Sequence, residues 1–152
     1  AFGKITLFFC AGAIFEATGK KYISQMVGIG KRMPITMTAF FIGSLSVIGI
    51  PLAGGFWSKF YLLMGTVESG QYAMLIILLT SSLLNAAYFF PITFRAFFCK
   101  ADDSLFEDKV EEAHPCAVIA LSLTALATMV LFFYPGPFFS LAEAATQQFM
   151  NF

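Results

Sequence analysis

Charged residues are scarce in this chain. Only 12% of its 152 residues are Asp, Glu, Lys or Arg, whereas 59% are hydrophobic. Charged side chains make up about 25% of a typical soluble globular domain. The composition therefore excludes an ordinary soluble domain and favours a protein whose solvent is the lipid bilayer.

A net charge of either sign is also absent. Nine basic and nine acidic residues give a formal net charge of zero. Nucleic-acid binding requires a basic field over part of the surface, which a balanced and sparsely charged chain does not supply. We therefore expect no nucleic-acid partner.

Residues and motifs that usually bind metals or cofactors are few. The three cysteines, Cys10, Cys99 and Cys116, form no C-x-x-C pair, and we expect them to be small core residues. The one histidine, His114, precedes Pro115 at a predicted helix start, where a surface or capping role is the usual one. Motifs for nucleotide binding, zinc proteolysis and serine hydrolysis are missing. The sequence predicts no catalytic residue, metal site or cofactor.

Long apolar stretches punctuated by proline and glycine dominate the rest of the chain. About 20 apolar residues cross a bilayer core as a helix. We predict an all-α fold of polytopic membrane helices in a single transmembrane region, 1–152, with about five helices near 1–17, 34–50, 51–68, 72–98 and 115–134, and a surface helix near 138–150. Because Ala1 leads directly into apolar sequence without an initiator methionine, we interpret the chain as a fragment.

Two polar connections separate these helices. Residues 20–33 alternate polar and apolar side chains, which predicts a short amphipathic piece at the membrane surface. Residues 100–114 hold most of the acidic side chains, which predicts a solvated loop.

The predicted helix at 51–68 is interrupted near residues 51–55. Pro51 removes a backbone donor, and Gly54 and Gly55 free the chain from helical geometry. Backbone groups at such a break need partners outside the helix ladder, so a break survives at membrane depth only where protein or water surrounds it.

Lys59 follows this break by one turn. A lysine at the bilayer centre costs about 2.5–3.5 kcal/mol on insertion scales, so it should face a hydrated interior or lose its proton, and both outcomes suit a proton relay. Alternatively, Lys59 reaches the headgroups from a helix end, with Trp57 as an interfacial anchor. Lys4 precedes eleven uncharged residues, and the same two interpretations apply to it.

A set of segments resembles the proton-conducting antiporter-like subunits. That family includes the large subunits of Mrp-type cation/proton antiporters and the membrane-arm subunits of respiratory complex I and of membrane-bound hydrogenases. The resemblance runs through roughly the first hundred residues. It is carried by residues 1–9, 11–14, 18–19, 30–36, 42–46 and 49–59.

The resemblance implies an inverted-repeat fold of about fourteen helices, of which this chain would hold the end of the second repeat and its broken helix. It implies that Lys4 relays protons along a hydrated central path and that Lys59 is the terminal group. Pro51, Gly54 and Gly55 form the break, and Ser58 and Trp57 are supporting candidates. The family's first repeat, with its own lysine and acidic partner, has no counterpart in this chain, and Gly3 and Thr6 occupy positions where other apolar residues are more common.

Within the family, residues 15–21, 85–91 and 94–98 look most similar to the D-type large subunit of the Mrp antiporters. The resemblance thus implies a proton-translocating subunit of a multisubunit monovalent cation/proton antiporter, with protons and a monovalent cation as its ions. It implies partner membrane subunits and a bacterial or archaeal cell membrane. One alternative is an antiporter-like subunit of complex I or of a membrane-bound hydrogenase, without redox centres of its own. A non-transporting scaffold subunit is the alternative from a different class.

Overall fold

The computed structural model describes residues 1–19, 22–99 and 112–150, and the regular structure in them is entirely helical. The long helices are α1 (Phe2–Thr18), α2 (Pro34–Ile48), α3 (Gly55–Glu68), α4 (Tyr72–Phe98), α5 (Pro115–Phe133) and α6 (Gly136–Met150). Two single turns of 3₁₀-helix, η1 (Ile23–Gln25) and η2 (Ile29–Lys31), connect α1 to α2. The predicted all-α fold class is confirmed.

Proline and glycine set several of the helix ends. Pro34 and Pro115 begin α2 and α5, at the position where a missing N–H costs nothing. Gly19 and Gly49 follow α1 and α2 in the left-handed conformation, with φ of 65° and 86°. The interruption predicted near 51–55 lies at residues 49–54, and α3 then runs without a break.

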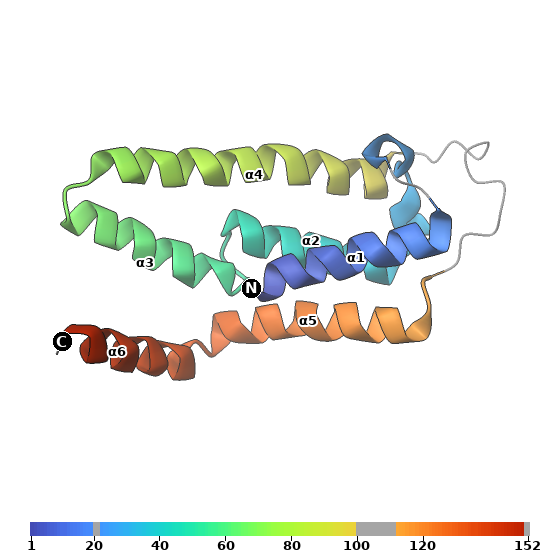
Figure 1. The fold of residues 1–152 in the computed structure, drawn as a ribbon. Coiled ribbons are helices and arrows are strands. Elements are labelled where there is room, and N and C mark those ends of the chain that lie inside the picture. The colour runs from blue at the N-terminus through green and yellow to red at the C-terminus, as the bar shows by residue number, and fades with distance from the viewer. Residues whose placement is uncertain (20–21, 100–111, 151–152) are drawn as a thin grey trace.

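Helix α2 is the centre of the bundle. It packs against α1, α4 and α5, and α1 also packs against α5. Figure 1 shows α2 and α3 lying end to end along the length of α4. Helices α5 and α6 also lie end to end, on the side of the bundle opposite α4. The buried core is therefore built mainly on small and medium side chains of the inner helices, among them Cys10, Ile14, Met37, Leu121 and Ala125.

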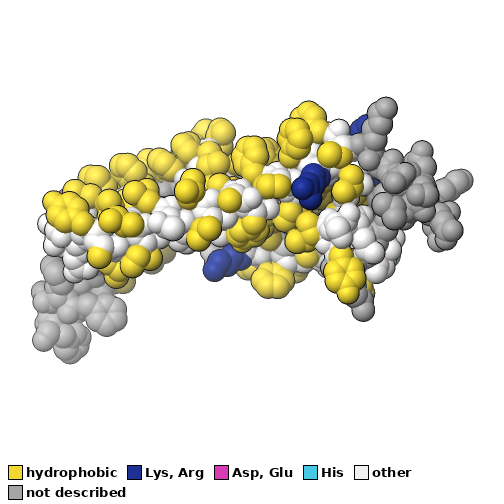
Figure 2. Space-filling model, turned by 90° about the horizontal axis from the view of Figure 1, so that it is seen from above, with side chains coloured by type: hydrophobic (Ala, Val, Ile, Leu, Met, Phe, Trp, Pro, Cys, Tyr) yellow, Lys and Arg dark blue, Asp and Glu magenta, His cyan; other side chains and the backbone are white. Residues whose placement is uncertain are grey.

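The outer faces of the bundle are apolar. Helices α4 and α5 are long and apolar enough to cross a membrane, and in the most hydrophobic window of α4 no residue is buried. Ile77, Leu83 and Leu84 of α4 are more than 60% exposed. Figure 2 shows hydrophobic side chains over most of the face that it presents. Such a surface requires lipid or further protein around it, as in an integral membrane protein.

The connection between α1 and α2 differs from the prediction. Ile29 and Met33 are fully buried, and Gly28 N–H donates to the carbonyl of Arg95 at 3.2 Å. Gly30 lies so close to the end of α4 that a Cβ on it would come within 2.9 Å of the Ala96 oxygen. Gly28, Ile29, Gly30 and Met33 thus belong to the core, whereas Lys31 and residues 22–24 keep the exposed position expected of a surface segment.

Two other predictions have mixed outcomes. Cys10 is a buried core residue as predicted, but Cys116 is exposed in the first turn of α5, so the core interpretation is wrong for it. His114 is exposed and is the residue at which α5 is capped, although its side chain makes no capping hydrogen bond. Of the predicted acidic loop, residues 100–111 lie outside the described residues.

Candidate functional site at the break between two helices

The break between α2 and α3 obtains its hydrogen bonds from neighbouring helices. Gly54 N–H donates to the carbonyl of Thr128 on α5 at 2.9 Å. Gly55 N–H donates to the hydroxyl of Ser46 on α2 at 3.3 Å. Leu52 has a φ of 101°, a conformation that a non-glycine residue adopts only where its surroundings enforce it. The break is thus a packed feature of the fold, with Pro51 and Leu52 at its exposed turn.

Gly55 allows α3 to start in direct contact with α2. A Cβ on Gly55 would overlap the carbonyl oxygen of Ser46. Gly3 on α1 approaches the same residue, since its Cβ would lie 2.8 Å from the Ser46 hydroxyl. Gly3 and Thr6 are both buried, and both face Gly43 on α2. These contacts explain why small residues occupy positions 3 and 6, which sequence reasoning left unexplained.

Lys59 reaches back across the break to the end of α2. Its Nζ donates to the carbonyl of Ile48, the last residue of α2, at 2.9 Å. It also donates to Oγ of Ser82 on α4 at 2.8 Å. The ammonium group therefore joins α2, α3 and α4 at one point.

The path of the Lys59 side chain depends on Gly49. A Cβ on Gly49 would come within 2.5 Å of Cδ of Lys59, so the aliphatic stem lies directly over this glycine. The φ of 86° at Gly49 is also a conformation that glycine adopts without strain. The glycine that ends α2 therefore makes the space through which Lys59 reaches its carbonyl.

The partners of Lys59 are neutral. Among the described residues it forms no ion pair with a carboxylate, and its two acceptors are a carbonyl and a hydroxyl oxygen. The C-terminal end of a helix carries a partial negative charge, equivalent to roughly half an elementary charge, which stabilises a cation there. A lysine held by dipoles alone can release its proton without leaving an unpaired carboxylate behind.

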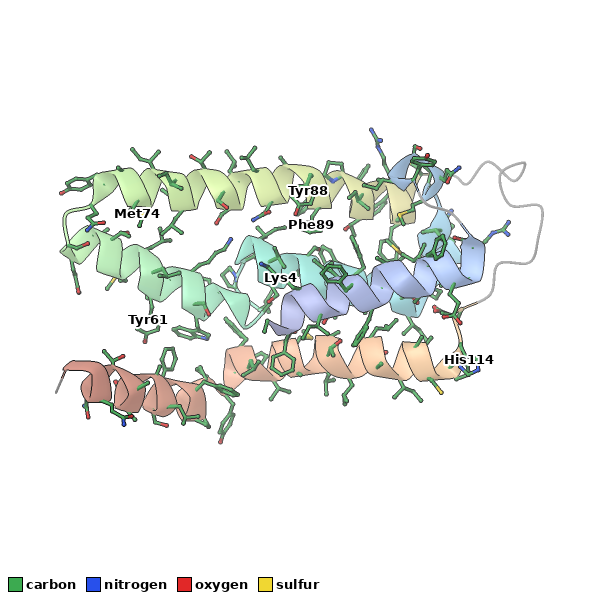
Figure 3. All side chains as sticks on the ribbon, viewed as in Figure 1. Lys4, Tyr61, Met74, Tyr88, Phe89 and His114 are labelled. Carbon is green, nitrogen blue, oxygen red and sulfur yellow. The ribbon has the colours of Figure 1, made fainter. Side chains whose placement is uncertain are left out.

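Lys4 has a different setting. It lies near the start of α1 (Figure 3), is exposed, and its side chain makes no hydrogen bond or ion pair with any residue that the structure describes. Its neighbour Gly3 faces α2. The structure therefore brings Lys59 to the break, and the hydrogen bonds of its Nζ go to Ile48 and Ser82, not to Lys4.

The two supporting candidates, Trp57 and Ser58, are oriented away from Lys59. Nε1 of Trp57 donates to the carbonyl of Phe132 on α5 at 2.9 Å, and its ring contacts Phe139 on α6. Ser58 is exposed and has no hydrogen bond within the described residues. Both line a cavity of about 420 Å³ between the start of α1, the break, α5 and α6. Trp57 thus joins α3 to α5, and the hydrogen bonds of the Lys59 ammonium group involve neither residue.

Sequence reasoning missed Ser82 at the site and Glu112 at the opposite end of α2. Ser82 lies in the Thr80–Ser82 run of an otherwise strongly apolar helix, and that polar run was an available signal. Glu112 was counted as part of a solvated loop. Its carboxylate instead accepts hydrogen bonds from Ile35 N–H and from the Thr36 hydroxyl, both at 2.8 Å, at the first turn of α2.

Comparison with known proteins gives one family. A family model described as NADH:quinone oxidoreductase/Mrp antiporter, TM, matches residues 1–85. The chain is 46% identical over 91 residues to NADH-quinone oxidoreductase subunit N of Desulforudis audaxviator, which covers 60% of this chain and 18% of that protein. It is 34% identical over 140 residues to NADH-quinone oxidoreductase subunit L of Rickettsia felis, covering 92% of this chain and 20% of that protein.

A solved structure shares the arrangement of the helices. The structure of the Mrp complex from Dietzia sp. DQ12-45-1b aligns with a TM-score of 0.74 at 18% identity, over 87% of this chain and 32% of the matched chain. The chain thus spans less than a third of the length of these relatives. At this identity the structural likeness is evidence for a common fold.

Proposed function

Because the chain belongs to the NADH:quinone oxidoreductase/Mrp antiporter family of membrane proteins, we propose that it forms part of a proton-translocating subunit in which Lys59 carries the proton. The observation that supports this best is the environment of Lys59 at the helix break. Its ammonium group has a helix-end carbonyl and a hydroxyl as partners and no carboxylate among the described residues.

The physical argument rests on the cost of a charge inside a membrane. Ionisable side chains within transmembrane segments are expensive, and they usually face a protein interior or a water-filled cavity on an ion pathway. A broken helix supplies such a setting, because its free backbone carbonyls hold a cation near the midplane. Lys59 has this arrangement with the end of α2. Gly49 leaves room for its side chain to reach the carbonyl of Ile48.

We assign Lys4 as a second proton carrier in the same subunit, on the strength of the family resemblance. Its exposed position on α1 leaves its Nζ available to groups outside the described residues. In this proposal Lys4 belongs to the central path and Lys59 to its end, with α4 and α5 crossing the membrane and α6 lying at its surface.

The assembly in which the subunit works has two candidates. Residues 15–21, 85–91 and 94–98 favour the D-type large subunit of a multisubunit cation/proton antiporter, which would exchange a monovalent cation for protons together with partner membrane subunits. The similarity to subunits N and L of NADH-quinone oxidoreductases favours a respiratory assembly. Purification of the full-length protein with its neighbours separates the two, because the partners are either small antiporter subunits or redox subunits. In either case we place the protein in a prokaryotic inner membrane.

Two substitutions of Lys59 in the full-length protein test the transport proposal against a scaffold role. Lys59→Ala removes the proton carrier, and Lys59→Arg keeps the positive charge on a group that does not release its proton. We expect both to abolish proton-coupled activity while the complex still assembles. Lys31→Ala, at an exposed lysine outside the break, is the control. Undiminished activity in the two Lys59 variants would overturn the proposal and favour the scaffold.

A further inference from the structure

The hydroxyl of Ser82 differs from the threonine hydroxyls on α4. Thr80 and Thr93 donate to the carbonyls of Ile76 and Phe89, one turn back on the same helix, at 2.7 and 3.1 Å. This is the usual behaviour of Ser and Thr within helices. Ser82 instead accepts a hydrogen bond from Nζ of Lys59, and no described residue accepts its own hydroxyl hydrogen. That hydrogen is therefore available to another acceptor.

Ser82 lies on the inner face of α4, at the boundary of the bundle. It shares this face with Phe89 and Thr93, which are buried against the inner helices, whereas Ser82 itself is half-buried. Its oxygen is bonded to Nζ of Lys59, and the residue as a whole remains partly exposed. Ser81, the preceding residue, is exposed, and its hydroxyl makes no hydrogen bond with the described residues.

A hydroxyl in this position suits both protonation states of the lysine. It accepts from the ammonium group, as the structure shows. After rotation it donates to the lone pair of the neutral amine. The carbonyl of Ile48 lacks this property, because it only accepts.

We propose that Ser82 is the residue through which Lys59 exchanges its proton with water, an inference that rests on the proposed function of Lys59. As the Nζ–H bond of Lys59 breaks, a new O–H bond forms on Ser82. The original hydroxyl proton of Ser82 passes in the same step to a water molecule on its other side. One proton leaves the lysine, one reaches water, and the serine is unchanged. Ser82 thereby links the terminal lysine to water.

Adjacent serines provide a matched test in the full-length protein within its complex. Ser82→Ala removes the hydroxyl next to Lys59, and Ser81→Ala removes an equivalent hydroxyl one residue away. Ser82→Thr keeps a hydroxyl at the site, and Ser82→Cys keeps the side-chain size with a much weaker hydrogen-bonding group. Proton translocation is measured in sealed vesicles by a pH-sensitive dye, and assembly is measured by co-purification of the partner subunits.

We expect Ser82→Ala and Ser82→Cys to lower the translocation rate at least tenfold, while Ser82→Thr and Ser81→Ala keep more than half of it. All four variants should assemble. Full activity in Ser82→Ala, or an equal loss in Ser81→Ala, would overturn the role of Ser82. If Ser82→Ala does not assemble, the Cys and Thr variants decide, and equal rates in these two would overturn it.

A parallel measurement on Lys59→Ala separates the two proposals. Loss of translocation in Lys59→Ala together with full activity in Ser82→Ala contradicts only the role of Ser82. Full activity in Lys59→Ala contradicts the proposed function itself, and the role of Ser82 fails with it.

Discussion

Lys59 and Glu112 bind opposite ends of the same helix. The ammonium group of Lys59 donates to the carbonyl of Ile48 at the end of α2. The carboxylate of Glu112 accepts from Ile35 N–H and the Thr36 hydroxyl at its start. A helix is stabilised by an anion at its N-terminus and a cation at its C-terminus. The central helix of the bundle is thus capped at both ends by charges from other segments.

This arrangement predicts that Glu112 contributes to stability. Glu112→Ala removes the acceptor of two hydrogen bonds at the start of α2, and loss of a helix N-cap costs about 1 kcal/mol. We expect a lower apparent unfolding temperature of the purified complex. Glu143→Ala, at an exposed residue of α6, should leave that temperature unchanged. Equal temperatures for the two variants would show that the contact with α2 contributes nothing.

Gly55 provides a second prediction, about the contact between α3 and α2. In Gly55→Ala the new methyl group would overlap the Ser46 carbonyl, so the start of α3 must move. Overpacking of this kind costs about 1–3 kcal/mol. We expect a lower unfolding temperature and impaired transport. Gly65→Ala on the same helix is the control, since nothing lies within 4 Å of its Cβ. A loss of stability in Gly65→Ala as large as in Gly55→Ala would contradict the steric explanation.

The break itself could be predicted from the sequence, whereas its partners could not. Pro51 acts on its own backbone, so its effect is readable locally, whereas Gly54 and Gly55 have right-handed or helical backbone and serve the close packing of the break against α5 and α2. The bond between Lys59 and Ser82 joins residues 23 positions apart, and it depends on how α3 and α4 pack. Ser81 and Ser82 are chemically identical in the sequence, and only the rotation of α4 distinguishes them.

Other features also required the assembled bundle. Glu112 lies 77 positions from Ile35, and as one acidic residue among many it gives no local sign that it caps a helix. The burial of Ile29 and Met33 follows from the packing of their connection against the end of α4. The all-α class, by contrast, follows from composition and apolar stretches alone.

Gly49 gives a third prediction, which isolates the placement of Lys59. Gly49→Ala introduces strain at a φ of 86° and also places a methyl group against Cδ of Lys59. Gly70→Ala introduces similar strain at a φ of 66°, with no atom within 4 Å of the new Cβ. Both should cost roughly 1 kcal/mol or more of stability. Only Gly49→Ala should also lower proton translocation, measured per assembled complex. Equal translocation rates in the two variants would indicate that the path of Lys59 over Gly49 is unimportant.

Lys4 provides the last prediction, because its structural and functional roles can be separated. Its side chain is exposed and makes no hydrogen bond or ion pair with the residues described here, so Lys4→Ala should change the free energy of unfolding by no more than about 0.5 kcal/mol. If Lys4 carries protons, both Lys4→Ala and Lys4→Arg should lose proton translocation in the full-length protein, because arginine keeps the charge without releasing a proton. If Lys4 only anchors α1 at the membrane surface, Lys4→Arg should remain fully active. The activity of the arginine variant, measured in sealed vesicles beside its unfolding temperature, therefore decides between the two roles.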